Sequence, residues 1–181
     1  MTGRVVGLYI AANAGGNMQA VLEVKAIQHQ GLEGDRYAGE RGAFSKSGRK
    51  VKRQVTLIEI EAIERVAKNS SNPFEAKDTR RNIVVSNFPL NRLVGKQFTV
   101  GDVYMRGVEL CDPCDRPDAL SGKKGFAELF KNCGGLRAEI LSTEIIKIGD
   151  MVEPITYKCL LCGTTTLYPH VCPEFYPELR K

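Results

Sequence analysis

The stretch Phe98-Thr-Val-Gly-Asp-Val-Tyr-Met-Arg-Gly-Val-Glu-Leu110 holds two apolar runs that meet at Gly101-Asp102. A Gly-Asp pair between apolar residues is typical of the tight turn that joins two antiparallel strands. The segment Lys147-Ile-Gly-Asp-Met151 has the same arrangement. We interpret the two segments as separate hairpins with common turn chemistry rather than as an internal repeat. Both predict antiparallel neighbours in a sheet.

Short strand-like runs continue on both sides of the quoted stretch. They are Val5–Ile10, Val21–Ile27, Val55–Ile58, Ile83–Val85, Leu136–Leu141, Ile145–Ile148 and Met151–Val152. Only two helices are expected, one directly after Ile58 and a short one at Phe126–Phe130. A parallel sheet would need a helix between successive strands. The pattern therefore predicts a mostly β fold, a closed or partly open antiparallel β-barrel with a few short helices.

Length and composition fit one globular domain. The chain has 181 residues, of which 43% are hydrophobic and 26% charged. No run resembles a signal peptide or a membrane span, so we expect a cytoplasmic protein with no membrane partner. The net charge of +5 fits an anionic small ligand, and without a binding motif or stacking aromatics we expect no nucleic-acid partner. Six cysteines in a cytosolic chain favour catalysis or metal binding over disulfides.

A pair of cysteines follows the second strand of the quoted stretch, in Cys111-Asp-Pro-Cys114-Asp-Arg-Pro117. Pro113 and Pro117 stiffen this loop, and a cysteine on a rigid loop at a strand end is well placed to meet a ligand. Arg116 would stabilise a thiolate, whereas the two aspartates would oppose it. Four interpretations stay open: a redox pair, half of a zinc site, one reactive cysteine with a structural neighbour, or two thiols without chemistry.

Seven sequence elements occur in an order that resembles the MOSC family, named for the C-terminal domain of molybdenum cofactor sulfurase. They are Gly31-Leu-Glu-Gly-Asp-Arg36, Arg53-Gln-Val-Thr-Leu-Ile-Glu59, Arg81-Asn-Ile-Val-Val85, Leu93-Val-Gly-Lys-Gln-Phe-Thr-Val-Gly-Asp102, Glu109-Leu-Cys-Asp-Pro-Cys114, Gly134-Gly-Leu-Arg-Ala-Glu-Ile140 and Ile148-Gly-Asp150. The resemblance ends near Pro154, so we expect a barrel domain at residues 1–154 and a separate tail at residues 155–181. It implies a β-barrel with one reactive cysteine near a strand end, a position that Cys114 matches better than Cys111.

The resemblance also implies binding of the molybdenum cofactor (molybdopterin) and two related activities. In the first, Cys114 carries a persulfide and delivers sulfur to a metal–sulfur centre; our own hypothesis adds Cys111 as a helper or resolving thiol. In the second, the Cys114 thiolate ligates molybdenum in an oxidoreductase that reduces N-hydroxylated compounds. The sulfurase has a pyridoxal-phosphate desulfurase domain, for which this chain is too short, so we expect sulfur from a separate cysteine desulfurase. A third hypothesis, from a different class, is a non-catalytic interaction module.

The residues that we expect to bind the cofactor all lie in the MOSC-like elements. They are Asp35, Arg36, Arg53, Arg81, Asn82 and Arg137. Arg36 is the first choice, and for Arg81 and Arg137 the alternative is a structural ion pair with Glu109 or Glu139. The chain between Gly34 and Gln54 is also rich in Arg and Lys. We interpret it either as a clamp for the cofactor's phosphate or as a solvated surface loop.

The tail contains a second group of cysteines. Cys159-Leu-Leu-Cys162-Gly163 resembles the first half of a zinc knuckle, and His170-Val-Cys172 would complete it. Four such ligands, Cys159, Cys162, His170 and Cys172, suit tetrahedral zinc. The alternative is a flexible tail with free thiols. In the third hypothesis the zinc-binding tail docks a partner.

Overall fold

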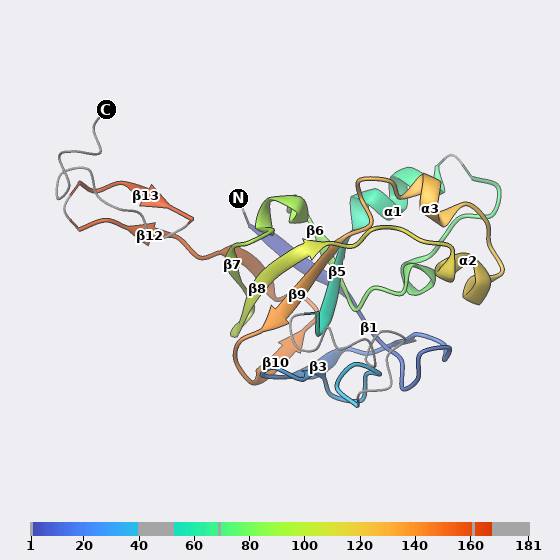
Figure 1. Cartoon of the computed structure of the whole chain (residues 1–181), viewed down its shortest axis with the longest axis horizontal. Coiled ribbons are helices and arrows are strands. Elements are labelled where there is room, and N and C mark those ends of the chain that lie inside the picture. Colours follow the sequence, from blue (N-terminus) through green and yellow to red (C-terminus); the bar gives the residue numbers. More distant parts are fainter. Residues whose placement is uncertain (1, 40–52, 69, 161, 168–181) are drawn as a thin grey trace.

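The computed structural model describes residues 2–39, 53–68, 70–160 and 162–167. Its centre is a β-barrel, and the helices gather at one side of it (Figure 1). Among the described residues, seven strands close the barrel. In order around it they are β1 (Gly3–Ile10), β11 (Met151–Pro154), β7 (Gln97–Val100), β8 (Val103–Leu110), β9 (Leu136–Ile140), β5 (Val55–Glu59) and β6 (Ile83–Ser86). Gly3 of β1 pairs with Val152 of β11, which joins the two edges of the sheet. The predicted mostly β barrel is confirmed.

The β7–β8 hairpin forms as its turn chemistry predicts. Val100 pairs with Val103, and Gly101 adopts a φ of 56°, a left-handed conformation that glycine reaches at low cost. The second hairpin prediction is wrong. Gly149 does turn the chain, but β10 (Glu144–Lys147) and β11 lie in different sheets. The N–H of Val5 donates to the carbonyl of Asp150, so β1 occupies the position that a hairpin partner would take.

One strand pair of the barrel is parallel, which the sequence pattern did not predict. β5 and β6 run in the same direction, with Leu57 opposite Ile83. Parallel neighbours need a long crossover, and the helix after Ile58 belongs to it. That crossover contains α1 (Ile60–Ala67) and the 3₁₀ helix η1 (Ala76–Thr79). The barrel is therefore mixed, although its other pairings are antiparallel.

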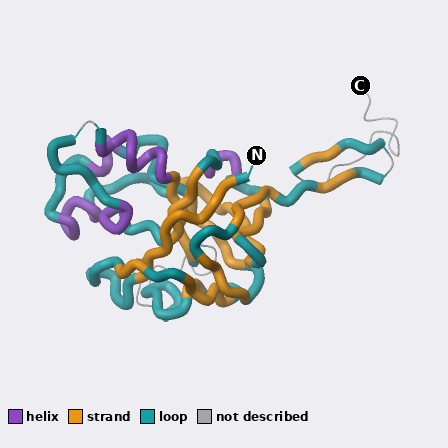
Figure 2. The backbone as a smooth tube through the Cα atoms, turned by 180° about the vertical axis from the view of Figure 1, so that it is seen from behind, coloured by secondary structure: helices purple, strands orange, loops and turns teal. Residues whose placement is uncertain are grey.

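Two groups of apolar side chains hold the fold. The first fills the barrel interior, because alternate residues of strands such as β8 point inward. The second lies outside the barrel, where the rings of Phe126 and Phe130 are stacked and Phe74 packs edge to face against both. Figure 2 shows the helices gathered on this side. They are α1, α2 (Arg116–Ser121) and the predicted short helix α3 (Phe126–Leu129), with η2 (Leu90–Leu93) nearer the barrel.

The remaining strands make smaller units. β2 (Gln19–Ala20) extends the barrel sheet beside β1, and β10, β3 (Glu23–Ile27) and β4 (Gly31–Leu32) form a separate three-stranded sheet. A hairpin of β12 (Tyr157–Lys158) and β13 (Thr165–Thr166) projects from the barrel at the start of the tail (Figure 1). None of the described helices combines the length and the apolar character that crossing a membrane requires.

Candidate functional site

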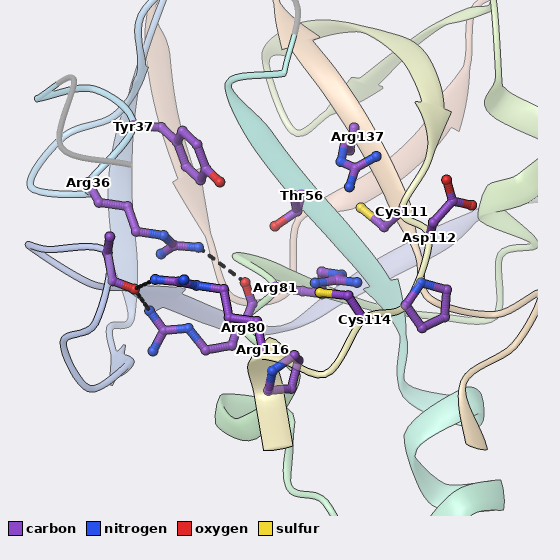
Figure 3. A pocket seen from close by; sticks show the side chains of 13 residues that line it. Arg36, Tyr37, Thr56, Arg80, Arg81, Cys111, Asp112, Cys114, Arg116 and Arg137 are labelled. Atoms are coloured by element: carbon purple, nitrogen blue, oxygen red, sulfur yellow. Dashed lines mark hydrogen bonds between the residues drawn. The ribbon is translucent and has the colours of Figure 1, made fainter. Parts of the chain in front are cut away.

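A pocket of about 290 Å³ opens beside the end of β8. Figure 3 shows its lining side chains, which come from segments far apart in the sequence. They belong to the loops after β1 and β4, to β5 and β9, to the segment between η1 and β6, and to the loop from β8 into α2. Its charged and sulfur-bearing residues are Arg36, Arg80, Arg81, Cys111, Asp112, Cys114, Arg116 and Arg137.

Both cysteines of the strand-end loop line this pocket, but they differ in exposure. Cys111 is only 2% exposed, and its backbone N–H donates to the carbonyl of Gly135 at 2.7 Å. Burial raises the pKa of the Cys111 thiol, although the charges of Arg81 and Arg137 act in the opposite direction. Cys114 is exposed. Of the two thiols, Cys114 is the one that a second molecule can reach.

Gly134 allows the thiol loop and Arg81 to lie close together. A Cβ atom at Gly134 would lie 2.1 Å from the carbonyl oxygen of Cys111, so a side chain there would push the loop away. The carbonyl of Gly134 accepts a hydrogen bond from Nε of Arg81 at 2.7 Å. One glycine thus brings Cys111 and a guanidinium to the same wall of the pocket.

Arg81 and Arg137 are the cations nearest in effect to the Cys111 thiol, since their charges act against the rise that burial causes in its pKa. Arg81 also donates to the carbonyl of Thr79 at 3.1 Å and lies over the ring of Phe126. Arg137 pairs with Glu109 at 2.7 Å and donates to the carbonyl of Leu110 at 3.2 Å. Because cations stabilise thiolates, this end of the pocket favours thiol chemistry.

A second group of arginines meets the loop that follows β1. Arg80 donates to the carbonyls of Gly16 at 2.6 Å and Ala14 at 3.1 Å, and Arg116 donates to the carbonyl of Ala14 at 2.8 Å. Arg36 donates to the carbonyl of Arg80 at 3.2 Å. Figure 3 marks hydrogen bonds within this group and places it across the pocket from Cys111.

Positive charge is in excess in the second group. Arg36 is paired with Asp35, whereas Arg80 and Arg116 have only backbone carbonyls as partners within the described residues. Burial and the neighbouring Arg36 and Arg116 lower the pKa of Arg80 to about 10, so it is still a cation at neutral pH. A bound anion would relieve this repulsion. The pocket therefore suits a ligand with a phosphate-like group at one end and chemistry with sulfur at the other.

The model of the MOSC domain family matches residues 28–153 of the chain. This chain belongs to the MOSC domain family. The family is associated with the molybdenum cofactor. The match includes both cysteines and all five arginines of the pocket.

Solved structures share the fold at low sequence identity. The YUAD protein from Bacillus subtilis superposes with a TM-score of 0.69 at 19% identity, over 84% of this chain and 95% of that one. YiiM from Geobacillus stearothermophilus gives a TM-score of 0.63 at 10% identity, and the match covers 83% of this chain and 74% of that one. YiiM from Escherichia coli gives a TM-score of 0.60 at 16% identity, and the match covers 83% of this chain and 68% of that one. No curated protein matches the chain in sequence.

Of the eight residues predicted to be catalytic or cofactor-binding, the MOSC barrel brings five into the pocket and leaves three outside its lining. Those in the pocket are Arg36, Arg81, Cys111, Cys114 and Arg137. Arg53 instead pairs with Glu109 at 2.7 Å. Asn82 is completely buried and Asp35 is 1% exposed, and the two side chains bond to each other at 3.1 Å. Asp35 also bonds Arg36 at 3.0 Å, so it acts on the pocket through that arginine.

Two pocket residues, Arg80 and Arg116, are missing from the predicted cofactor-binding set. Arg80 directly precedes Arg81, and the left-handed turn at Arg80 (φ 63°) separates the two side chains, so that one meets the loop after β1 and the other the thiols. Arg116 is the first residue of α2. For Arg80 the only sequence signal was its position beside Arg81, since strand periodicity does not extend into these connections. Arg116 was singled out in the sequence only as a partner for a thiolate, whereas in the structure it donates a hydrogen bond to the carbonyl of Ala14.

The structure of this MOSC chain tests neither the zinc-binding prediction for the tail nor the phosphate-binding prediction for the basic loop. Cys159 and Cys162 are half-buried thiols in the turn between β12 and β13. His170 and Cys172 lie outside the described residues, as do residues 40–52 of the basic loop. Among the described residues no group of three or more metal-binding side chains occurs. The zinc knuckle at Cys159, Cys162, His170 and Cys172 therefore stays a prediction.

Proposed function

We propose that this chain binds the molybdenum cofactor in the arginine-lined pocket and that Cys114 carries sulfur there as a persulfide. One observation carries the proposal: an exposed thiol opens onto a pocket that five arginines line. Membership of a family associated with the cofactor supports the identity of the ligand. The carrier role of Cys114 is our own inference from its exposure and its cationic surroundings.

The residues of the pocket fit the cofactor on chemical grounds. A phosphate needs forked cationic donors, and neither Arg80 nor Arg116 forms a direct ion pair with a carboxylate of the described residues, although the charge of Asp35 acts on Arg80. The volume of about 290 Å³ lies just below the usual range for pockets that bind small organic ligands, roughly 300–1,000 Å³. A thiolate at Cys114 is a soft donor that suits molybdenum and sulfur chemistry. When bound, the cofactor would supply a metal–sulfur centre as acceptor.

The residues of this chain then have separate tasks. Arg36, Arg80 and Arg116 hold the anionic end of the ligand, and Arg81, whose charge favours the Cys111 thiolate, lies at the other end. The thiolate of Cys114 attacks the outer sulfur of a cysteine desulfurase persulfide. A bond forms between Cys114 Sγ and that sulfur, the donor's S–S bond breaks, and the donor cysteine leaves as a thiolate. Cys114 thereby holds one transferable sulfur.

The test combines metal content with sulfur loading. Full-length protein is incubated with cofactor released from a molybdenum enzyme, gel-filtered and analysed for molybdenum, and a second sample is treated with a cysteine desulfurase and cysteine before intact-mass analysis. Bound molybdenum together with one added sulfur supports the proposal. Bound molybdenum with reduction of an N-hydroxylated compound, and without added sulfur, would make Cys114 a metal ligand instead. A protein that neither binds molybdenum nor gains sulfur would contradict the proposal and favour the third hypothesis, a non-catalytic interaction module.

Replacing Arg80 by alanine is expected to weaken cofactor binding by about 10- to 100-fold, because a hydrogen bond to a charged group contributes about 1.5–3 kcal/mol. Arg116→Ala should act in the same direction. The matched control is Arg92→Ala, which removes the same charge from an exposed position outside the pocket lining. Molybdenum retained after gel filtration at increasing protein dilution measures the effect. Equal retention by the Arg80 and Arg92 variants would contradict the assignment of the anion site.

A further inference from the structure

Cys111 has no task in the function proposed so far, yet it shares the pocket with Cys114. Figure 3 shows both sulfur atoms pointing into the cavity, toward the arginines. Many cysteine pairs that alternate between dithiol and disulfide are separated by two residues, as Cys111 and Cys114 are. A buried thiol beside an exposed one in the same cavity therefore needs a chemical explanation.

The backbone holds the two cysteines differently. The N–H of Cys111 is bonded to Gly135, and its carbonyl packs against Gly134, so Cys111 cannot shift without disturbing β9. Asp112 and Cys114 donate no backbone hydrogen bond to any residue of the described chain. Cys114 can therefore move toward Cys111 without breaking a hydrogen bond of its own N–H.

Electron counting shows what a neighbouring thiol would add. The outer sulfur of a persulfide is at the oxidation level of elemental sulfur, whereas a sulfido ligand or free hydrosulfide is two electrons more reduced. A carrier with a single cysteine passes on sulfur without these electrons. A second thiol supplies both of them when it becomes half of a disulfide.

We propose that Cys111 is the resolving thiol that releases the sulfur of Cys114 as hydrosulfide. This step rests on the proposed persulfide at Cys114. Sγ of Cys111 attacks Sγ of Cys114, a bond forms between these two atoms, and the bond from Cys114 to the outer sulfur breaks. The outer sulfur leaves with the bonding electron pair and takes the proton of the Cys111 thiol, so that thiol plus persulfide anion becomes disulfide plus HS⁻. A dithiol reductant must then reopen the Cys111–Cys114 disulfide before the next turnover.

The charges at the thiol end fit this order of events. Burial raises the pKa of Cys111, so in the resting protein it keeps its proton and does not compete with Cys114 for the sulfur donor. Arg81 and Arg137 lie close enough to favour the Cys111 thiolate, which is the form that attacks. The same cations would stabilise the departing hydrosulfide.

The experiment follows the fate of the sulfur in the full chain without cofactor. Wild type, Cys111→Ser, Cys111→Ala and Cys133→Ser are treated with a cysteine desulfurase and cysteine, desalted without reductant and sampled over time. Intact mass and peptide mapping report persulfide and disulfide, and a bimane trap reports hydrosulfide. Cys133 is the control because it is a half-buried free thiol outside the pocket lining.

Wild type and Cys133→Ser should gain one sulfur, then lose it as one equivalent of hydrosulfide while a Cys111–Cys114 disulfide forms. Both Cys111 variants should load equally but release hydrosulfide more slowly, on the order of 100-fold, because a thiol held beside its target has a large effective concentration. Release at the wild-type rate from either folded Cys111 variant, or sulfur that moves to Cys111 without release, would overturn the resolving role alone. Cys111 variants that gain no sulfur, together with a wild-type protein that forms neither persulfide nor hydrosulfide, would overturn the proposed function and this step with it.

Discussion

Cys114→Ser is expected to abolish sulfur loading by a cysteine desulfurase, while the wild-type protein gains one sulfur atom. A serine hydroxyl has almost no anionic form at neutral pH and a hard oxygen, so it neither attacks a persulfide nor holds sulfur. Cys114 is the exposed thiol of the pocket. Its loss removes the first step rather than slowing it.

Intact-mass analysis followed by peptide mapping is the measurement, because Cys159 and Cys162 are partly exposed as well. Cys133→Ser is the control and should load like wild type. The variant should remain folded, since the Cys114 side chain lies at the surface. Undiminished sulfur on the Cys114→Ser protein, mapped to Cys111 or to the tail, would exclude Cys114 as the carrier.

Asn82→Ala is expected to lower the free energy of unfolding by about 2–5 kcal/mol, since buried groups that lose their partner cost about 1–3 kcal/mol each. The Asn82 side chain is fully buried. Its Oδ1 accepts from the N–H and the hydroxyl of Thr56 at 3.2 and 2.9 Å, and its Nδ2 donates to the carbonyl of Tyr9 and to Asp35, both at 3.1 Å. This side chain ties β5, β1 and the loop after β4 together.

Denaturant unfolding of the wild type and the Asn82→Ala variant measures this loss. The comparison requires that the free energy of unfolding has the same dependence on denaturant concentration in both proteins. Asn91→Ala is the matched control: its side chain is exposed and donates a single hydrogen bond to the carbonyl of Asn132, so a change below about 1 kcal/mol is expected. Because Asp35 holds Arg36, the Asn82 variant should also bind the cofactor more weakly. A loss of stability no greater than that of the control would show that water or neighbouring groups replace these hydrogen bonds.

The residues predicted from family-like elements to bind the cofactor divide by position: some face the pocket and others face the protein interior or an ion-pair partner, and their binding to the cofactor stays a prediction. Arg36, Arg81 and Arg137 line the cavity, whereas Asn82 serves the buried network and Arg53 pairs with Glu109. All of these residues lie in equally recognisable sequence elements. Sequence similarity identifies the element, but the direction of each side chain depends on how strands and loops from other parts of the chain pack around it.

The amino-acid sequence by itself determined the strands and the Gly101-Asp102 hairpin, because turn chemistry and the alternation of apolar residues act over a few neighbouring residues. The MOSC family was also recognisable from the sequence, through its resemblance in seven ordered elements. Only the tertiary structure decided the parallel β5–β6 pair, since that pairing depends on the crossover through α1. It also decided which thiol is accessible. Cys111 and Cys114 occupy one short motif, but Cys111 lies against Gly134 and Gly135 while Cys114 opens onto arginines from distant segments. Burial and electrostatic environment arise from long-range packing, which a local pattern does not encode.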